Sequence, residues 1–205
     1  VADDGTHGRE IWTTDGTPGG TILLADINPN QASSSASGFT PSNGLVYFSA
    51  NDGLDGFELW ATNGTPAGTR RVADIYPFTV GSTPQALTAF AGGVAFSAAD
   101  PVAGRELWFS DGTTSGTRMI ADIAAGGPGS DPVDLCVLGD LLFFRADDGV
   151  HGEELWVSDG TAQGTRLVAD LNAGAAHARP ADLVALGDVV VFVANDGQFG
   201  VELWK

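Results

Sequence analysis

The chain has 205 residues, of which 43% are hydrophobic, so it can bury a sizeable core and is too apolar for a disordered segment. Its 26 Asp and Glu residues outnumber its 9 Lys and Arg residues and give a formal net charge of -17 at pH 7. This charge repels phosphate backbones and anionic lipids, so we expect neither nucleic acid nor a membrane surface as a partner. No run reaches the ~18 apolar residues of a membrane-spanning helix, so no membrane insertion is expected. The single cysteine, Cys136, has no partner for an internal disulfide.

A repeat of 48 residues organises the whole chain. The five tryptophans Trp12, Trp60, Trp108, Trp156 and Trp204 follow one another at intervals of 48 residues, with no insertion or deletion. The string around each one is clearest at residues 148–165, DGVHGEELWVSDGTAQGT. We therefore predict a single repeat domain over residues 1–205. Its periods are 1–48, 49–96, 97–144 and 145–192, with a partial fifth period at 193–205.

The first residues of the chain lie inside a period. Residues 1–13 (VADDGTHGREIWT) and 193–205 (VANDGQFGVELWK) fill the same slots of the repeat. Because the sequence opens inside a repeat, we expect it to be a piece of a longer chain.

The connection that begins at Ile27 is rich in serine over residues 33–37, which predicts an irregular strand after it.

The strands of one period are clearest in the third period and the connection that follows it. Four short apolar runs are predicted as strands a, b, c and d, at 135–138, 141–144, 154–157 and 166–171. Turns rich in Gly and Asp separate them, at 139–140, 146–152 and 159–165, and a longer polar connection follows at 172–179. The runs are apolar on both faces, as expected for a sheet that is covered on both sides.

A four-stranded antiparallel meander that repeats every 48 residues and is covered on both faces is typical of the blade of a β-propeller. We therefore predict an all-β fold, a β-propeller built from 48-residue four-stranded antiparallel blades. Two arrangements stay open. The ends could join to give about four blades, or the chain could be an arc of a larger ring.

The string ELW-x-x-DGT-x-x-GT, as at residues 106–117 and 154–165, resembles the ELWxxDGT repeat family. These are tandem repeats of large bacterial proteins, and the resemblance covers the whole chain. It departs at Ile11, which replaces Leu, at Asn63, which replaces Asp, and at Pro101, which replaces Gly. The resemblance implies an extracellular or cell-surface protein and no agreed biochemical activity.

Each period carries the same polar residues in the turn between strands b and c. An Asp recurs at 4, 52, 100, 148 and 196, a Gly four residues later, and a Glu two residues before each Trp. One interpretation is calcium, because oxygen ligands on a Gly-rich turn suit a hard cation. The tentative ligands are Asp147, Asp148 and Glu154, and then Asp3, Asp4 and Glu10. The preferred interpretation is structural, with the Asp side chains accepting backbone N–H bonds and Gly supplying positive φ.

The tryptophans also allow two interpretations. A Trp at a fixed strand position in every period is typical of an anchor between neighbouring blades, whereas sugar-binding proteins stack their ligands on exposed Trp rings. We predict that Trp60, Trp108 and Trp156 lie between blades. The three histidines, His7, His151 and His177, show no metal-binding spacing.

The function expected from these patterns is not enzymatic. Catalysis needs a cluster of unlike groups in one place, whereas this chain offers the same groups in every period. We expect an extracellular or cell-surface interaction or scaffold module, with a protein or glycan surface partner and possible assembly with further repeats or chains. No cofactor is expected apart from the tentative calcium. The alternative is a secreted propeller lectin or a polysaccharide-active enzyme.

Overall fold

The computed structural model describes all 205 residues, and they form an all-β protein with five antiparallel sheets. The only helical element is a short 3-10 turn, η1, at Pro66–Gly68. No helix in the structure has the length and apolarity needed to cross a membrane. The predicted all-β class is therefore confirmed.

The three middle sheets each have four strands in chain order, as predicted for strands a to d. The second sheet contains β4 (Ser37–Ser42), β5 (Leu45–Asn51), β6 (Phe57–Thr62) and β7 (Arg70–Ala73). The third contains β8 (Gln85–Phe90), β9 (Gly93–Asp100), β10 (Gly104–Ser110) and β11 (Arg118–Ala121). The fourth contains β12 (Val133–Leu138), β13 (Leu141–Asp147), β14 (Glu153–Ser158) and β15 (Arg166–Ala169).

The first and last sheets have three strands each. The first contains β1 (Ala2–Asp3), β2 (Arg9–Thr13) and β3 (Ile22–Ala25), which are a two-residue piece of strand b followed by strands c and d. The last contains β16 (Ala181–Leu186), β17 (Val189–Asn195) and β18 (Val201–Trp204), which are strands a, b and c. The first sheet therefore has no strand a, and the last sheet has no strand d.

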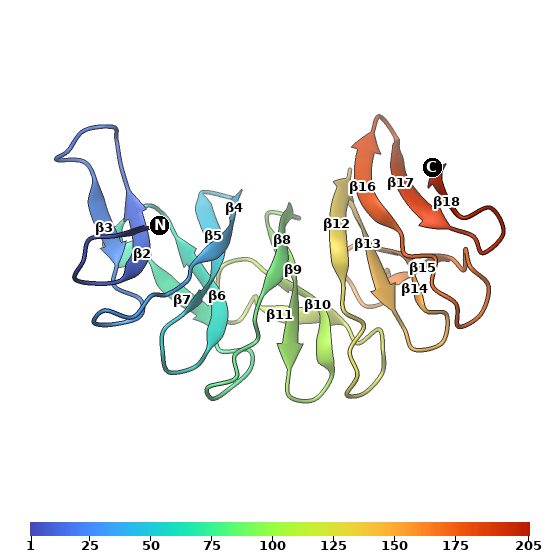
Figure 1. Ribbon diagram of the computed structural model, residues 1–205, viewed down its shortest axis with the longest axis horizontal. Coiled ribbons are helices and arrows are strands. Elements are labelled where there is room, and N and C mark those ends of the chain that lie inside the picture. The colour runs from blue at the N-terminus through green and yellow to red at the C-terminus, as the bar shows by residue number, and fades with distance from the viewer.

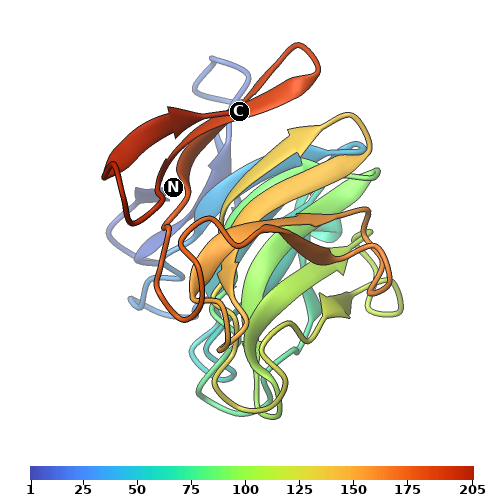
Figure 2. The same cartoon turned by 90° about the vertical axis from the view of Figure 1, so that its right-hand side faces the viewer.

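The five sheets follow one another along an open arc (Figure 1). The a strands β4, β8, β12 and β16 are neighbours in space, and they line the concave side of the arc. Figure 2 looks along the arc from its C-terminal end, where the last sheet lies in front. The two chain ends lie at opposite ends of the arc (Figure 1), so this chain does not close a ring by joining its own ends.

The hairpin between strands a and b is built from residues with positive φ, as two-residue hairpin turns of this kind require. Asn43 and Gly44 supply φ values of 48° and 77°, and Ala91 and Gly92 supply 48° and 76° in the next sheet. Strand β4, expected to be irregular, has six residues like β8, β12 and β16. It also shares their register shift, between Ser37 and Thr40. The expected irregularity is therefore present in β4, and it is shared by the a strands of the other sheets.

Four hydrophobic clusters fill the spaces between successive sheets. The cluster between the second and third sheets contains Tyr47, Leu59 and Phe96, all fully buried. Clusters of the same kind lie between the first and second sheets, the third and fourth, and the fourth and fifth. Each middle sheet is therefore covered by core on both faces, as its apolar strands predicted.

The tryptophans of the middle sheets pack in these clusters. Trp60 packs against the cluster between the first and second sheets, and Trp108 packs against the cluster between the second and third. Trp156 is part of the cluster between the third and fourth sheets. Each stands opposite a phenylalanine of strand b, as Trp108 stands opposite Phe96. The prediction that Trp60, Trp108 and Trp156 lie between neighbouring sheets is confirmed.

Truncation of a middle tryptophan should destabilise the protein. Trp108→Ala removes a large side chain from the core between the second and third sheets, so we expect a loss of about 3–5 kcal/mol in the free energy of unfolding. Urea unfolding followed by circular dichroism measures it. Trp12→Ala is the matched control, because Trp12 lies in the first sheet, with no sheet on its outer side, and its loss should be smaller. Equal losses would contradict the assignment.

Candidate functional site

Four glutamates are buried at the start of strand c and hold the connection that leads to the next sheet. Each accepts three main-chain N–H bonds, from residues 17, 18 and 24 positions further along the chain, over 2.8–3.4 Å. They are Glu10, Glu58, Glu106 and Glu154, each at most 1% exposed. A carboxylate with three charge-assisted bonds compensates for the loss of water around it.

The surroundings of these carboxyl groups shift their pKa values. Burial raises the pKa of Glu58, Glu106 and Glu154, while the bonds from the loop amides lower it in part. The hydroxyl groups of Ser82 and Ser130 donate a further bond to Glu58 and Glu106. Glu154 has no such bond, because Ala178 occupies that position.

The recurrent aspartates form the turns between strands b and c. Oδ1 of Asp148 accepts the N–H groups of Val150 and His151 at 2.9 and 2.8 Å, and Oδ1 of Asp147 accepts that of Gly149 at 2.7 Å. The same bonds recur at Asp4, Asp52, Asp100 and Asp196. These are the backbone N–H bonds that the structural interpretation of these residues predicts.

The recurrent glycines bring the b–c turn into contact with the next connection. Gly152 has φ of 72°, and a Cβ atom there would stand 2.6 Å from the carbonyl oxygen of Ala176. Gly8, Gly56 and Gly104 are crowded in the same way by the connection that follows them. A side chain at these positions would push the turn off the loop that the buried Glu holds.

Two of the turns carry a histidine–aspartate pair. His7 Nδ1 lies 2.7 Å from Asp4 Oδ2, and His151 Nδ1 lies 2.7 Å from Asp148 Oδ2. The bond from His7 lowers the pKa of Asp4 to about 2. The bond to the aspartate raises the pKa of both histidines.

The tentative calcium ligands lie within these structural networks. Asp147 and Asp148 accept backbone N–H groups of the turn between strands b and c, whereas Glu154 accepts those of the connection to the next sheet. Asp3, Asp4 and Glu10 make the same bonds in the first sheet. No group of three or more His, Cys, Asp or Glu side chains is gathered in a way that could hold a metal ion. A calcium ion needs six to eight oxygen ligands, so it would have to recruit backbone carbonyls or water.

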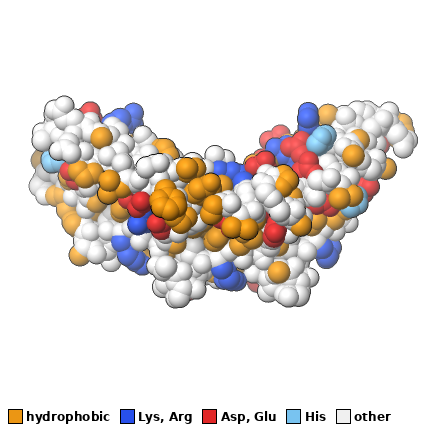
Figure 3. Space-filling model, turned by 90° about the horizontal axis from the view of Figure 1, so that it is seen from below, with side chains coloured by type: hydrophobic (Ala, Val, Ile, Leu, Met, Phe, Trp, Pro, Cys, Tyr) orange, Lys and Arg blue, Asp and Glu red, His pale blue; other side chains and the backbone are white.

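A charged cluster in the fourth sheet breaks the repeat. Glu153 Oε2 accepts a bond from Nε of Arg179 at 2.9 Å, and Nε of Arg145 lies 3.8 Å from Glu153 Oε1. His177 Nδ1 accepts the N–H of Glu153 at 2.9 Å. Figure 3 shows acidic, basic and histidine side chains side by side toward the C-terminal end of the arc. Nε of Arg145 is buried and has no hydrogen-bond partner. This cluster is one of the polar groups that do not recur from sheet to sheet, and Arg71 with Asp52, Asp55 and Asp74 in the second sheet is another.

This cluster could not be predicted from the repeat, because its residues do not recur from one period to the next. The slot of Glu153 holds Phe57 and Arg105 in the two preceding sheets, and the slot of Arg145 holds Ser97 one period earlier. A comparison of the periods position by position would have singled out these departures. His177 is an exposed residue of the connection, and its Nδ1 accepts the backbone N–H of Glu153 in β14.

Comparisons with known proteins add no relative. No protein-family profile and no curated protein matches the chain. The resemblance to the ELWxxDGT repeats therefore stays a prediction from the motifs.

Removal of one buried carboxylate should destabilise the protein, because three main-chain N–H groups of the connection lose their acceptor. Glu106→Ala leaves the N–H groups of Ile123, Ala124 and Ser130 without their acceptor, so we expect a loss of about 3 kcal/mol or more in the free energy of unfolding. Chemical denaturation measures it. Glu202→Ala is the matched control, since Glu202 fills the same slot but is exposed, and its effect should stay within about 0.5 kcal/mol. A small effect at Glu106 would contradict the structural role.

The histidine pairs predict a pH dependence. NMR titration should place the pKa of His151 above the ordinary value of 6.5, because the charged ring is bonded to Asp148. The pair therefore stabilises the fold below pH 6.5, and this contribution is lost as the pH rises through the raised pKa. Asp148→Asn should return the pKa of His151 toward 6.5 while that of His7 stays raised. A raised pKa of His151 in the variant would be inconsistent with this cause.

Calcium can be tested directly. We expect the thermal midpoint to be the same in calcium and in chelator, because turn bonds and loop amides already engage Asp148 and Glu154. A midpoint that rises with calcium, and does so less in Asp148→Ala, would instead establish the ion at these turns.

Proposed function

We propose that this chain is a non-enzymatic interaction and scaffold module of an extracellular or cell-surface protein, built from repeats of the ELWxxDGT type. Its sheets would be the blades of a β-propeller ring larger than the arc that this chain forms. The neighbouring a strands on the concave side and the four cores between the sheets support this arrangement.

One observation carries the proposal. The carboxylates that recur in the chain are engaged in holding the backbone, in the same way in four successive sheets. Buried carboxyl groups with raised pKa values are common at catalytic sites, but here each one accepts bonds from its own loop. The recurring buried carboxylates therefore stabilise the regular stack of sheets, and a partner would be recognised by side chains on the surface.

The acidic composition restricts the partner. A net charge of -17 disfavours nucleic acid and anionic lipid, so the expected partner is a protein or a glycan surface. The charged cluster of Arg145, Glu153, His177 and Arg179 is the place where a polar ligand such as a glycan would meet groups that differ from the rest of the repeat. This cluster favours a lectin as the second candidate, ahead of a polysaccharide-active enzyme.

A glycan array and a binding assay with surface extract test the proposal on the same purified protein. We expect binding without chemical change of the ligand. Arg179→Ala should abolish glycan binding if the cluster is the site, whereas Arg70→Ala, in the second sheet and outside the cluster, should keep it. Release of reducing ends from any bound polysaccharide would refute the non-enzymatic role.

A further inference from the structure

A glycine that directly follows an Asp or Asn recurs along the chain, and such a pair is chemically labile. There are seven Asp–Gly pairs and two Asn–Gly pairs, Asn43–Gly44 and Asn63–Gly64. The backbone nitrogen of the glycine can attack the side-chain carbonyl carbon of the residue before it, because glycine has no Cβ atom to hinder the approach. The negative charge of an Asp carboxylate opposes this attack, so the two Asn–Gly pairs are the more reactive ones at neutral pH.

Most of these glycines have their N–H group held by a hydrogen bond. In all seven Asp–Gly pairs and in Asn63–Gly64, the glycine N–H donates to a side-chain oxygen two residues earlier, over 2.7–3.0 Å. The nitrogen must lose its proton when it attacks, and a bond that already holds this proton has to be given up first. The turns between strands b and c and between c and d therefore protect the labile pairs that they contain.

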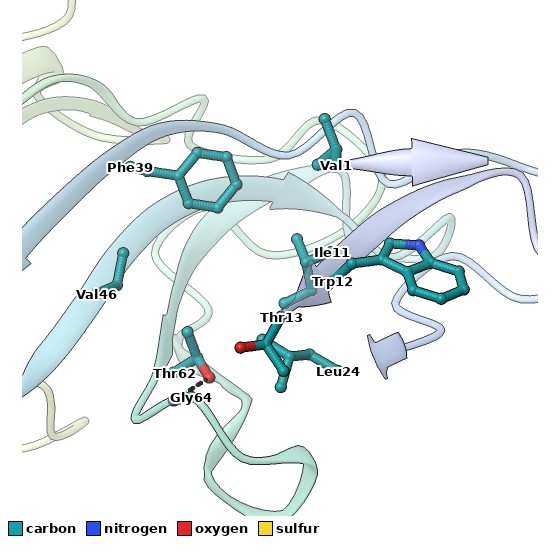
Figure 4. A pocket seen from close by; sticks show the side chains of 9 residues that line it. All are labelled: Val1, Ile11, Trp12, Thr13, Leu24, Phe39, Val46, Thr62 and Gly64. Carbon is teal, nitrogen blue, oxygen red and sulfur yellow. Dashed lines mark hydrogen bonds between the residues drawn. The ribbon is translucent and has the colours of Figure 1, made fainter. Parts of the chain in front are cut away.

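Asn63–Gly64 is protected at both reacting groups. The N–H of Gly64 donates to Oγ1 of Thr62 at 3.0 Å (dashed line in Figure 4). Oδ1 of Asn63 accepts the N–H of Thr65 at 3.1 Å and its hydroxyl group at 2.7 Å. These three bonds hold the nucleophile and the carbonyl group apart from each other's path, so they must be rearranged before the two can react.

Asn43–Gly44 is the one pair without such protection. These residues form the tip of the hairpin between β4 and β5, with φ of 48° and 77°. Ser42 pairs with Leu45 across the tip, so the strand bonds close the hairpin without the N–H of Gly44. Neither this N–H nor the side chain of Asn43 forms a hydrogen bond. Both reacting groups are therefore free to come together.

The exposure of this tip is a property of the repeat. Residues 43 and 44 are exposed, and so are residues 91–92 and 139–140 at the same hairpin of the third and fourth sheets. All three tips lie in sheets that have a neighbour on each side, so water reaches position 43 wherever the chain begins or ends.

We propose that Asn43 is a site of spontaneous deamidation in the folded protein and that Asn63 is protected from it. The nitrogen of Gly44 attacks Cγ of Asn43, the bond from Cγ to Nδ2 breaks, and Nδ2 takes up the proton that Gly44 loses and leaves as ammonia. Water then adds to one of the two carbonyl carbons of the cyclic imide and opens the ring. The product is aspartate or isoaspartate at position 43, and water is the only co-reactant.

The two products act differently on the hairpin. Aspartate keeps the main chain and tolerates positive φ, so β4 and β5 stay paired. Isoaspartate adds a methylene group to the main chain, which a two-residue turn can hold only if the pairing of Ser42 with Leu45 shifts. Either product adds one negative charge to a net charge of -17. The second sheet therefore changes irreversibly with the age of the molecule, whatever the function of the protein.

Peptide mapping by mass spectrometry tests the site on the intact chain after incubation at mildly alkaline pH. Three hydrogen bonds restrain Asn63 and none restrains Asn43, so we expect Asn43 to deamidate roughly 10- to 100-fold faster in the folded protein. In concentrated urea the two pairs should react at similar rates, because only the fold distinguishes them. The variant Asn43→Ser should lose the early acidic form seen by ion-exchange chromatography.

The cause of the protection can be tested separately. Thr62→Val removes the acceptor of the Gly64 N–H, so deamidation of Asn63 should become roughly 3- to 10-fold faster while that of Asn43 stays the same. Ser110→Ala is the matched control, since it removes the corresponding acceptor of Gly112 in the third sheet and should leave Asn63 at the parental rate.

Two results overturn the assignment of the site. They are deamidation of Asn63 as fast as that of Asn43 in the folded protein, and an Asn43 that reacts in urea but not in the folded protein. An unchanged rate at Asn63 in Thr62→Val overturns the protection by the hydrogen bond. None of these results touches the scaffold function, which fails only if the protein transforms a ligand.

Discussion

The structure depends on the burial of one carboxylate per period. A glutamate at most 1% exposed would cost far more than the fold can supply unless its charge is compensated, and here three main-chain N–H groups do so. Those donors stand 17, 18 and 24 residues after the glutamate in each of four sheets. The connection between sheets must therefore keep its length and path, whatever its sequence. This requirement explains how the Ser-rich connection after Ile27 and the Gly-rich one after Ile123 can end in the same place.

The cores follow from the same anchor. The residue after each glutamate, Leu59 or Leu107 for example, points to the next sheet, and the fixed connection brings that sheet against it. The turn glycines let the loop approach closely, since a Cβ at Gly56 would stand 2.7 Å from the backbone of Gly81. The polar anchor and the apolar cores thus support each other, and each sheet depends mainly on its immediate neighbours.

The sequence predicted the elements well because each strand is bounded by turn residues with a clear physical signal. Asp148 and Gly149 mark a turn, and the 48-residue spacing carries that assignment to the other periods. It could not predict the register shift within strand a, where Ala86 and Asp134 have φ of 53° and 54°. Asp tolerates positive φ, but Ala86 gives no signal for such a conformation, so the surrounding structure must impose it there. The curvature of the arc was missed for a related reason, because it arises from contacts between segments that are distant in the sequence.

The acidity of the chain has the same structural origin. In every period an Asp accepts backbone N–H groups in the turn between strands b and c. Asp15, Asp111 and Asp159 do the same in the turn between strands c and d, and the buried Glu adds another negative charge. Asp and Glu are chosen there because an ionised oxygen is a stronger acceptor of backbone N–H groups than a neutral one. The charge of -17 therefore accumulates with the number of periods, and it repels polyanions. What distinguishes one part of the surface from another is the departure from the repeat, and the cluster at Glu153 is a departure of that kind.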